Sequence, residues 1–160
     1  MKDLLLVAGL LAAPVTASVQ QYRPAPAIGE KDPRLSRLEK FFGDRDCPLR
    51  AAAQDFLIAA DQNQLDWRLL PSISFIESSG GKDYRNNNVL GWASCKEKFS
   101  SVRAGIHYVA AQLGKSSRYR DKDTDKKLRI YNPVPLYPEK VKAIMRAIGP
   151  GAQPRMLAAD

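Results

Sequence analysis

The stretch that decides the fold reads LLPSISFIESSGGK and spans residues 69–82. Its apolar residues recur three and four positions apart, as they do along one side of an α-helix. Phe75 lies opposite this main apolar arc, and Gly80 and Gly81 end the pattern. A helix that is apolar nearly all round is buried in a domain core, so we expect this helix to be central.

The same helical spacing continues on both sides of that stretch, and most segments begin with a capping residue or a proline. The segments predicted to be helical are 33–43, 48–60, 66–78, 101–113, 123–131 and 138–148. Residues 82–99 lack this helical spacing of apolar residues and contain three consecutive asparagines and a polar centre. The predicted fold class is therefore mainly α, with a small lobe, a loop or a β-hairpin, between the third and fourth helices.

The 160 residues suit a single domain of ordinary size with flanking segments. Lys2, an apolar run and the small-residue pattern Val15-Thr16-Ala17 indicate an export signal. That run is shorter than the roughly 20 residues that span a bilayer, so we expect no membrane span and a location in the periplasm, outside the cell or in the cell wall. The expected organisation is a signal peptide over 1–17, a flexible linker over 18–31, the working domain over 32–149 and a disordered tail over 150–160.

The charge balance favours an anionic partner, because 25 Lys and Arg against 17 Asp and Glu give a net charge of +8. The basic residues gather over 115–129, interleaved with aspartates, which fits either a solvated face or attraction to an anionic cell wall. The export signal and the lack of a nucleic-acid motif argue against nucleic acid. One His and two Cys are too few for the usual zinc sites, so we expect no metal and no cofactor.

Glu77 is the residue that breaks the apolar pattern of the central helix. At about 100° per residue, its side chain projects between those of Ile73 and Leu70. Burial and the negative end of the helix dipole both disfavour an ionised carboxylate there. Glu77 is therefore a candidate general acid. The alternative is that it pairs with a Lys or Arg or turns its tip to solvent.

Two motifs in order carry a family resemblance. The sequence Glu77-Ser78-Ser79-Gly80-Gly81-Lys82, followed by Asn87-Asn88-Val89-Leu90-Gly91-Trp92, resembles the motif pair of lysozyme-like peptidoglycan-cleaving enzymes. It is most similar to glucosaminidase-type domains, described as mannosyl-glycoprotein endo-β-N-acetylglucosaminidase-like. Ile130-Tyr131-Asn132-Pro133 stands where the similar lytic transglycosylases have Tyr-Asn-Ala-Gly. The resemblance covers 66–148, with two departures: Pro133, and Gly91-Trp92-Ala93-Ser94 in place of Gly-Leu-Met-Gln.

The resemblance implies an α+β lysozyme-like fold and cleavage of the β-1,4 bond between N-acetylated sugars of peptidoglycan. It implies Glu77 as the acid and base, with the Tyr131 hydroxyl near it. Ser78 would support Glu77 or the substrate, and Asn88 would pin the loop to the helix. A hydrolase would need a second carboxylate, for which Asp83 and Glu97 are the candidates. The predicted substrate-binding residues are Ser78, Asn88, Trp92, Asn132 and Tyr119, the two aromatic ones as sugar platforms or packing residues.

The two cysteines of an exported protein favour one disulfide, Cys47 to Cys95. A rival hypothesis is a Cys95/His107 nucleophile pair, as in cell-wall peptidases. Two functional alternatives thus stand beside a glycan-cleaving enzyme, which is either a hydrolase or a lytic transglycosylase. One is the peptidase, and the other is a non-catalytic peptidoglycan-binding module with a lysozyme-like shape. In each case we expect a monomer.

Overall fold

The computed structural model describes residues 32–151. The predicted signal peptide, the linker and all but the first two residues of the predicted tail lie outside the described residues. No helix in the described range is both long enough and apolar enough to cross a membrane.

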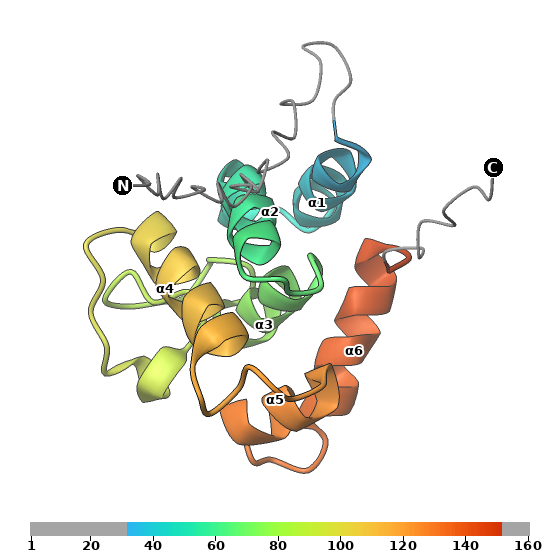
Figure 1. Cartoon of the computed structure of the whole chain (residues 1–160). Helices are drawn as coiled ribbons and strands as arrows, with labels where there is room; N and C mark the ends of the chain where they lie inside the picture. Colours follow the sequence, from blue (N-terminus) through green and yellow to red (C-terminus); the bar gives the residue numbers. More distant parts are fainter. Residues whose placement is uncertain (1–31, 152–160) are drawn as a thin grey trace, which may run out of the picture. The chain divides into compact units, whose positions relative to one another are not determined.

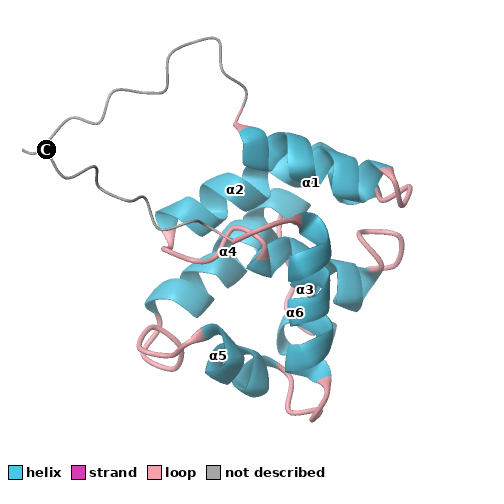
Figure 2. Ribbon diagram, turned by 90° about the vertical axis from the view of Figure 1, so that its right-hand side faces the viewer, coloured by secondary structure: helices cyan, strands magenta, loops and turns pink. Residues whose placement is uncertain are grey.

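The described part of the chain is mainly helical, as predicted, and contains no strand (Figures 1 and 2). The fourth, fifth and sixth helices begin within one residue of the positions that the sequence predicts. The elements in order are α1 (Pro33–Gly43), the 3₁₀ helix η1 (Pro48–Ala52), α2 (Ala53–Gln62), α3 (Leu69–Ser78), the 3₁₀ helix η2 (Trp92–Cys95), α4 (Val102–Lys115), α5 (Thr124–Tyr131) and α6 (Tyr137–Ile148).

Local capping explains where the helices begin. The side chains of Asp32, Ser101 and Asp123 each accept a hydrogen bond from a backbone N–H in the first turn of α1, α4 and α5. The segment that begins at Pro48 first forms η1 and becomes α-helical only at Ala53. The capping and proline signals of the sequence therefore predict most helix starts correctly.

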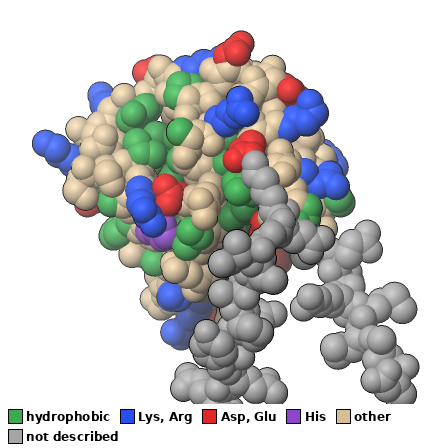
Figure 3. All heavy atoms as spheres, turned by 90° about the horizontal axis from the view of Figure 1, so that it is seen from above, with side chains coloured by type: hydrophobic (Ala, Val, Ile, Leu, Met, Phe, Trp, Pro, Cys, Tyr) green, Lys and Arg blue, Asp and Glu red, His purple; other side chains and the backbone are tan. Residues whose placement is uncertain are grey.

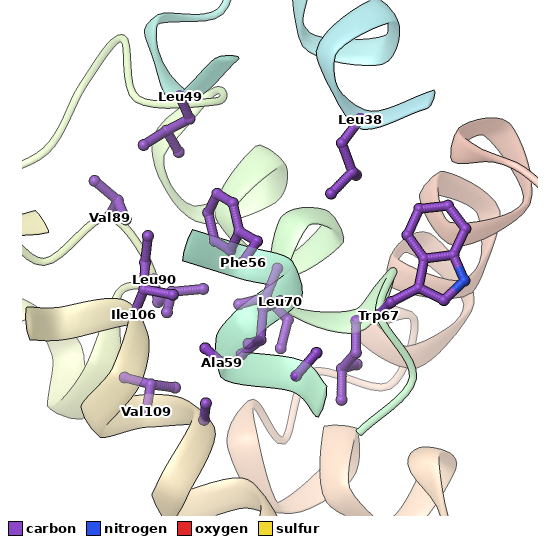
Figure 4. Packing of buried hydrophobic residues seen from close by; sticks show 14 of the residues in the cluster. Leu38, Leu49, Phe56, Ala59, Trp67, Leu70, Val89, Leu90, Ile106 and Val109 are labelled. Atoms are coloured by element: carbon purple, nitrogen blue, oxygen red, sulfur yellow. The ribbon is translucent and has the colours of Figure 1, made fainter. Parts of the chain in front are cut away.

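The core is built around α3, which packs against α2 on one side and α6 on the other. Leu70 and Ile73 of α3 are fully buried. Figure 4 shows Leu70 next to Phe56 of α2 within the apolar cluster. Because α3 is central, the residues at its C-terminal end are held by neighbours from several elements.

The lobe over 82–99 is a loop with turns and η2, which is the first of the two expected alternatives, and it contains no β-hairpin. Strands need extended backbone, but several residues here have left-handed conformations with positive φ: Asn86, Asn87, Ala93, Ser94 and Cys95. Asparagine side chains tie the loop together instead. Asn86 donates to the Cys95 carbonyl, and Asn87 donates to the Phe99 carbonyl.

Phe56 provides a test of this core, because it is fully buried and its ring lies 6.0 Å from that of Phe42. Phe56→Ala should lower the free energy of unfolding by about 3–5 kcal/mol, since it removes buried apolar surface and leaves a cavity. Urea denaturation followed by circular dichroism measures this loss. Tyr84→Ala, at a position that is 45% exposed, is the control and should change stability by about 0.5 kcal/mol or less. Equal effects of the two substitutions would contradict the described core.

Candidate functional site

A pocket of about 560 Å³ lies where the end of α3, the η2 segment, the end of α4 and α5 meet. This volume is in the range of small-molecule binding sites. Five predicted site residues line it: Glu77, Trp92, Tyr119, Tyr131 and Asn132. The other lining residues are Gly91, Ala93, Ser94, Gln112, Ser116, Arg118, Ile130 and Pro133. The structure thus brings together residues from four separate parts of the sequence.

Glu77 is held by a buried tyrosine. The hydroxyl of Tyr137, the first residue of α6, donates a hydrogen bond to Glu77 Oε1 over 2.7 Å. Within the described chain Glu77 makes no ion pair with a Lys or Arg. Sequence reasoning did not assign Tyr137 to the site, because only the packing of α6 on α3 brings it to the carboxylate. Its position beside Pro138, at a helix start six residues after Tyr131, was the available signal.

Gly91 lies directly against the second oxygen of the Glu77 carboxylate. A Cβ at this position would stand 2.5 Å from Glu77 Oε2, which is closer than non-bonded atoms approach, and the backbone has a φ of +68°. Both the space and the backbone conformation therefore require glycine. This close approach explains physically why a glycine stands in the motif Leu90-Gly91-Trp92.

Aromatic side chains form a continuous wall beside the carboxylate. The ring of Trp92 lies 5.6 Å from that of Tyr131 and 6.1 Å from that of Tyr119, measured between centroids. The ring of Tyr131 in turn stacks on that of Tyr137 at 6.2 Å. Such rings can cover the C–H face of a sugar while polar edges hydrogen-bond to its hydroxyls.

The two tyrosines nearest Glu77 are hydrogen-bond donors. Tyr131 donates to the Leu90 carbonyl, so its hydroxyl fixes the loop next to Gly91, whereas Tyr137 is the residue that contacts the carboxylate. Burial, followed by the charge of Glu77, raises the pKa of Tyr131. Burial and the hydrogen bond to Glu77 raise the pKa of Tyr137. Both hydroxyls therefore keep their protons at neutral pH.

Ser78 and Asn88 support the site from outside the pocket lining. The Ser78 hydroxyl donates to the Ser74 carbonyl and accepts from the Gly81 N–H, which stabilises the turn after α3. The Asn88 side chain donates to the Trp92 carbonyl and accepts from the Trp92 N–H. Asn88 thus fixes Trp92 within the loop rather than pinning the loop to the helix.

Asp83 and Glu97, the candidates for a second carboxylate, do not line the pocket. Both residues are exposed on the lobe. Among the described residues that line the pocket, Glu77 is the one with a carboxylate. The described range likewise holds no group of His, Cys, Asp and Glu suited to bind a metal ion.

The expected disulfide is not formed, because Cys47 and Cys95 are both free. Cys47 packs against Gly80, where an added Cβ would stand 2.4 Å from its Sγ. Cys95 lies at the end of η2 and is half-buried. The number of cysteines in a sequence does not determine where their sulfur atoms lie, and here the two cysteines have different surroundings.

The peptidase hypothesis gains no support from this geometry. A nucleophile and its base must lie within hydrogen-bond reach, and no hydrogen bond joins Cys95 to His107 in the described structure. His107 Nε2 is buried there without a hydrogen-bond partner.

No model of a known protein family matches this chain, and no curated protein is found to be related to it.

Thiol titration tests whether Cys47 and Cys95 are free. Denatured protein prepared without reductant should show two reactive thiols. In the folded protein Cys95 should react first, since Cys47 is buried and burial raises the pKa of its thiol, which lowers the fraction of reactive thiolate. Cys95→Ser and Cys47→Ser identify each phase. Absence of reactive thiol in the denatured protein would contradict the free cysteines and restore the disulfide.

The buried tyrosines predict a loss of stability at alkaline pH. The pKa values of Tyr131 and Tyr137 are raised above the value of about 10 for an unfolded chain. Full stability is therefore present below about pH 10, and it falls above that pH because the unfolded state releases protons that the folded state keeps.

Thermal unfolding from about pH 8 to about pH 11 measures this dependence. The double variant Tyr131→Phe/Tyr137→Phe should show a shallower alkaline decline than the wild type, with Tyr84→Phe as the exposed control. An identical decline in all three proteins would show that the buried phenols do not couple to folding.

Proposed function

We propose that this protein cleaves the glycan strand of peptidoglycan at the β-1,4 bond between N-acetylated sugars, with Glu77 as general acid and base. The observation that carries the proposal is the carboxylate of Glu77, hydrogen-bonded by Tyr137 at the side of a pocket walled by Trp92 and Tyr131. A proton donor beside a sugar platform is what cleavage of a glycosidic bond requires.

The resemblance to lysozyme-like enzymes supports the same function. Residues from each of the matching motifs, Glu77, Gly91, Tyr131 and Asn132, line one pocket although they are far apart in the sequence. We therefore propose a lysozyme-like arrangement of the helices, in which the 82–99 lobe forms one wall of the site without a hairpin.

The single carboxylate favours a lytic transglycosylase reaction over hydrolysis. Hydrolysing glycosidases commonly use two carboxylates that flank the bond, and Asp83 and Glu97 are exposed outside the pocket. A reaction in which the substrate supplies the second nucleophile needs only one. Product analysis separates the two reactions.

In the proposed reaction, Glu77 first donates its proton to the glycosidic oxygen, and the bond from that oxygen to C1 breaks. The carbonyl oxygen of the N-acetyl group then bonds to C1 and stabilises the positive charge. Glu77, now ionised, removes the proton of the C6 hydroxyl, and O6 attacks C1 to displace the carbonyl oxygen. The product is a 1,6-anhydro sugar, no water is consumed, and Glu77 regains its proton.

The neighbours of Glu77 fit these two roles. Tyr137 fixes Oε1 by a hydrogen bond, and because its hydroxyl keeps its proton it does not compete as a base. Gly91 packs against Oε2, where a side chain would clash with the carboxylate. One carboxylate is thereby held in one orientation for both proton transfers.

We propose that this activity acts at the cell wall, because the predicted export signal and the positive charge both favour that location. The net charge of +8 attracts an anionic wall polymer by long-range electrostatics. On the face shown in Figure 3, Lys and Arg side chains are spread among acidic and uncharged ones rather than gathered in one patch. This pattern suits general attraction to a wall more than a defined nucleic-acid groove.

Glu77→Gln tests the function directly. The amide keeps the shape of the carboxylate but can neither donate nor accept the catalytic proton, so release of soluble fragments from purified sacculi should fall by about 10²–10⁴-fold or more. Circular dichroism should show an unchanged fold. Asp83→Asn and Glu97→Gln are matched controls that remove an exposed carboxylate outside the pocket, and they should retain turnover.

Unchanged turnover in Glu77→Gln would overturn the proposal. Binding of both wild type and variant to sacculi, with no fragment release by either protein, would instead identify a non-catalytic wall-binding module.

A further inference from the structure

Arg118 is the cation among the described residues that line the pocket. It lies in the loop between α4 and α5, is exposed, and makes no ion pair within the described chain. Its neighbours differ, since Arg120 pairs with Asp121 and Arg129 pairs with Asp125. Arg118 is thus an arginine at the site whose charge no nearby carboxylate neutralises.

The aromatic wall orients this arginine. The guanidinium carbon of Arg118 lies over the ring of Tyr119, 5.8 Å from its centroid. A cation at this distance from a ring is attracted to its face. Tyr119 is itself buried and its ring contacts that of Trp92, so the guanidinium rests on a fixed platform next to the proposed sugar-binding surface.

A free guanidinium beside a ligand pocket suits a carboxylate ligand. Its planar set of N–H donors matches the two oxygens of a carboxylate, and this charge-assisted pair is stronger than a neutral hydrogen bond. Neutral polymers of N-acetylglucosamine carry no such group. The glycan of peptidoglycan does, either on the lactyl ether of muramic acid or on the peptide attached to it.

We propose that Arg118 binds a carboxylate of the glycan substrate and gives the pocket a preference for carboxylate-bearing strands over neutral ones. This inference rests on the proposed function and adds the chemical group that the site recognises. Gln112 and Ser116 also line the pocket, and the Ser116 hydroxyl donates to the Gln112 carbonyl.

Binding measured in an inactive background tests this proposal separately from catalysis. In the Glu77→Gln variant, dissociation constants are compared for soluble glycan strands with free carboxylates and for the same strands after carboxyl amidation. Adding Arg118→Met should reduce the preference for the free carboxylate by about tenfold or more, the value of a charge-assisted hydrogen bond. Arg118→Lys should keep part of the preference, since it retains the charge without the planar set of donors.

Arg120→Met is the matched control. It also removes one positive charge, but Arg120 lies two residues along the chain from Arg118 and does not line the pocket. It should leave the preference as in the parent protein. The proposal is overturned if Arg118→Met changes affinity for free and amidated strands equally, or if Arg120→Met has the same effect as Arg118→Met.

Two substrate preparations identify the source of the carboxylate. If Arg118→Met reduces the preference for free carboxylates on peptide-free strands, the lactyl group is the ligand. If it reduces this preference only on peptide-bearing strands, the ligand is a carboxylate of the attached peptide. Either result supports the proposal. Failure of the proposed catalysis can be distinguished from failure of the proposed binding. If the wild type binds carboxylated strands through Arg118 but releases no fragments, the catalytic proposal is wrong and the binding proposal stands.

Discussion

The site depends on how the last turn of α3 is held, and the hydrogen bond from Tyr137 to Glu77 is the contact that holds it. This bond joins residues 60 positions apart in the sequence and connects the end of α3 to the start of α6. A partly buried carboxylate loses solvation unless a donor replaces the water it gives up. The buried Tyr137 hydroxyl supplies that donor. The orientation of the carboxylate therefore depends on how α6 packs against α3.

The lobe over 82–99 is shaped to the same carboxylate. Gly91 approaches Glu77 Oε2 more closely than any residue with a side chain would allow. On one side of Gly91 the Leu90 carbonyl accepts from Tyr131, and on the other side Asn88 holds the backbone of Trp92. A loop without regular hydrogen-bonded structure is therefore fixed by side chains, which is how it forms a defined wall of a pocket.

Features governed by local chemistry could be predicted from the sequence. The starts of α4 and α5 follow from Ser101 and Asp123, because an N-cap bond involves residues two or three positions apart. The place of Glu77 at a pocket follows from its position on an otherwise apolar helix. Asn86 and Asn87 adopt left-handed conformations that asparagine tolerates, but hairpin turns use the same conformation, so these residues could not distinguish a loop from a hairpin.

Features set by packing between distant segments could not be predicted. The position of Tyr137 after Tyr131 was a signal, but it does not show that the Tyr137 hydroxyl meets Glu77, and no spacing in the chain brings Arg118 to the pocket. The same is true of the cysteines, because an oxidising compartment permits a disulfide but the fold decides whether two sulfurs meet. Ala93 and Ser94 adopt left-handed backbone conformations that neither residue type favours, so their identity gave no indication of them.

In the proposed reaction the C6 hydroxyl of the substrate attacks C1, so that no water is consumed. Mass spectrometry of the fragments that the wild-type protein releases from purified sacculi tests it most directly. We expect sugar ends that are lighter by one water than hydrolysis products, as 1,6-anhydro rings are. Reducing ends that carry the mass of an added water would contradict it and require a second group to activate that water.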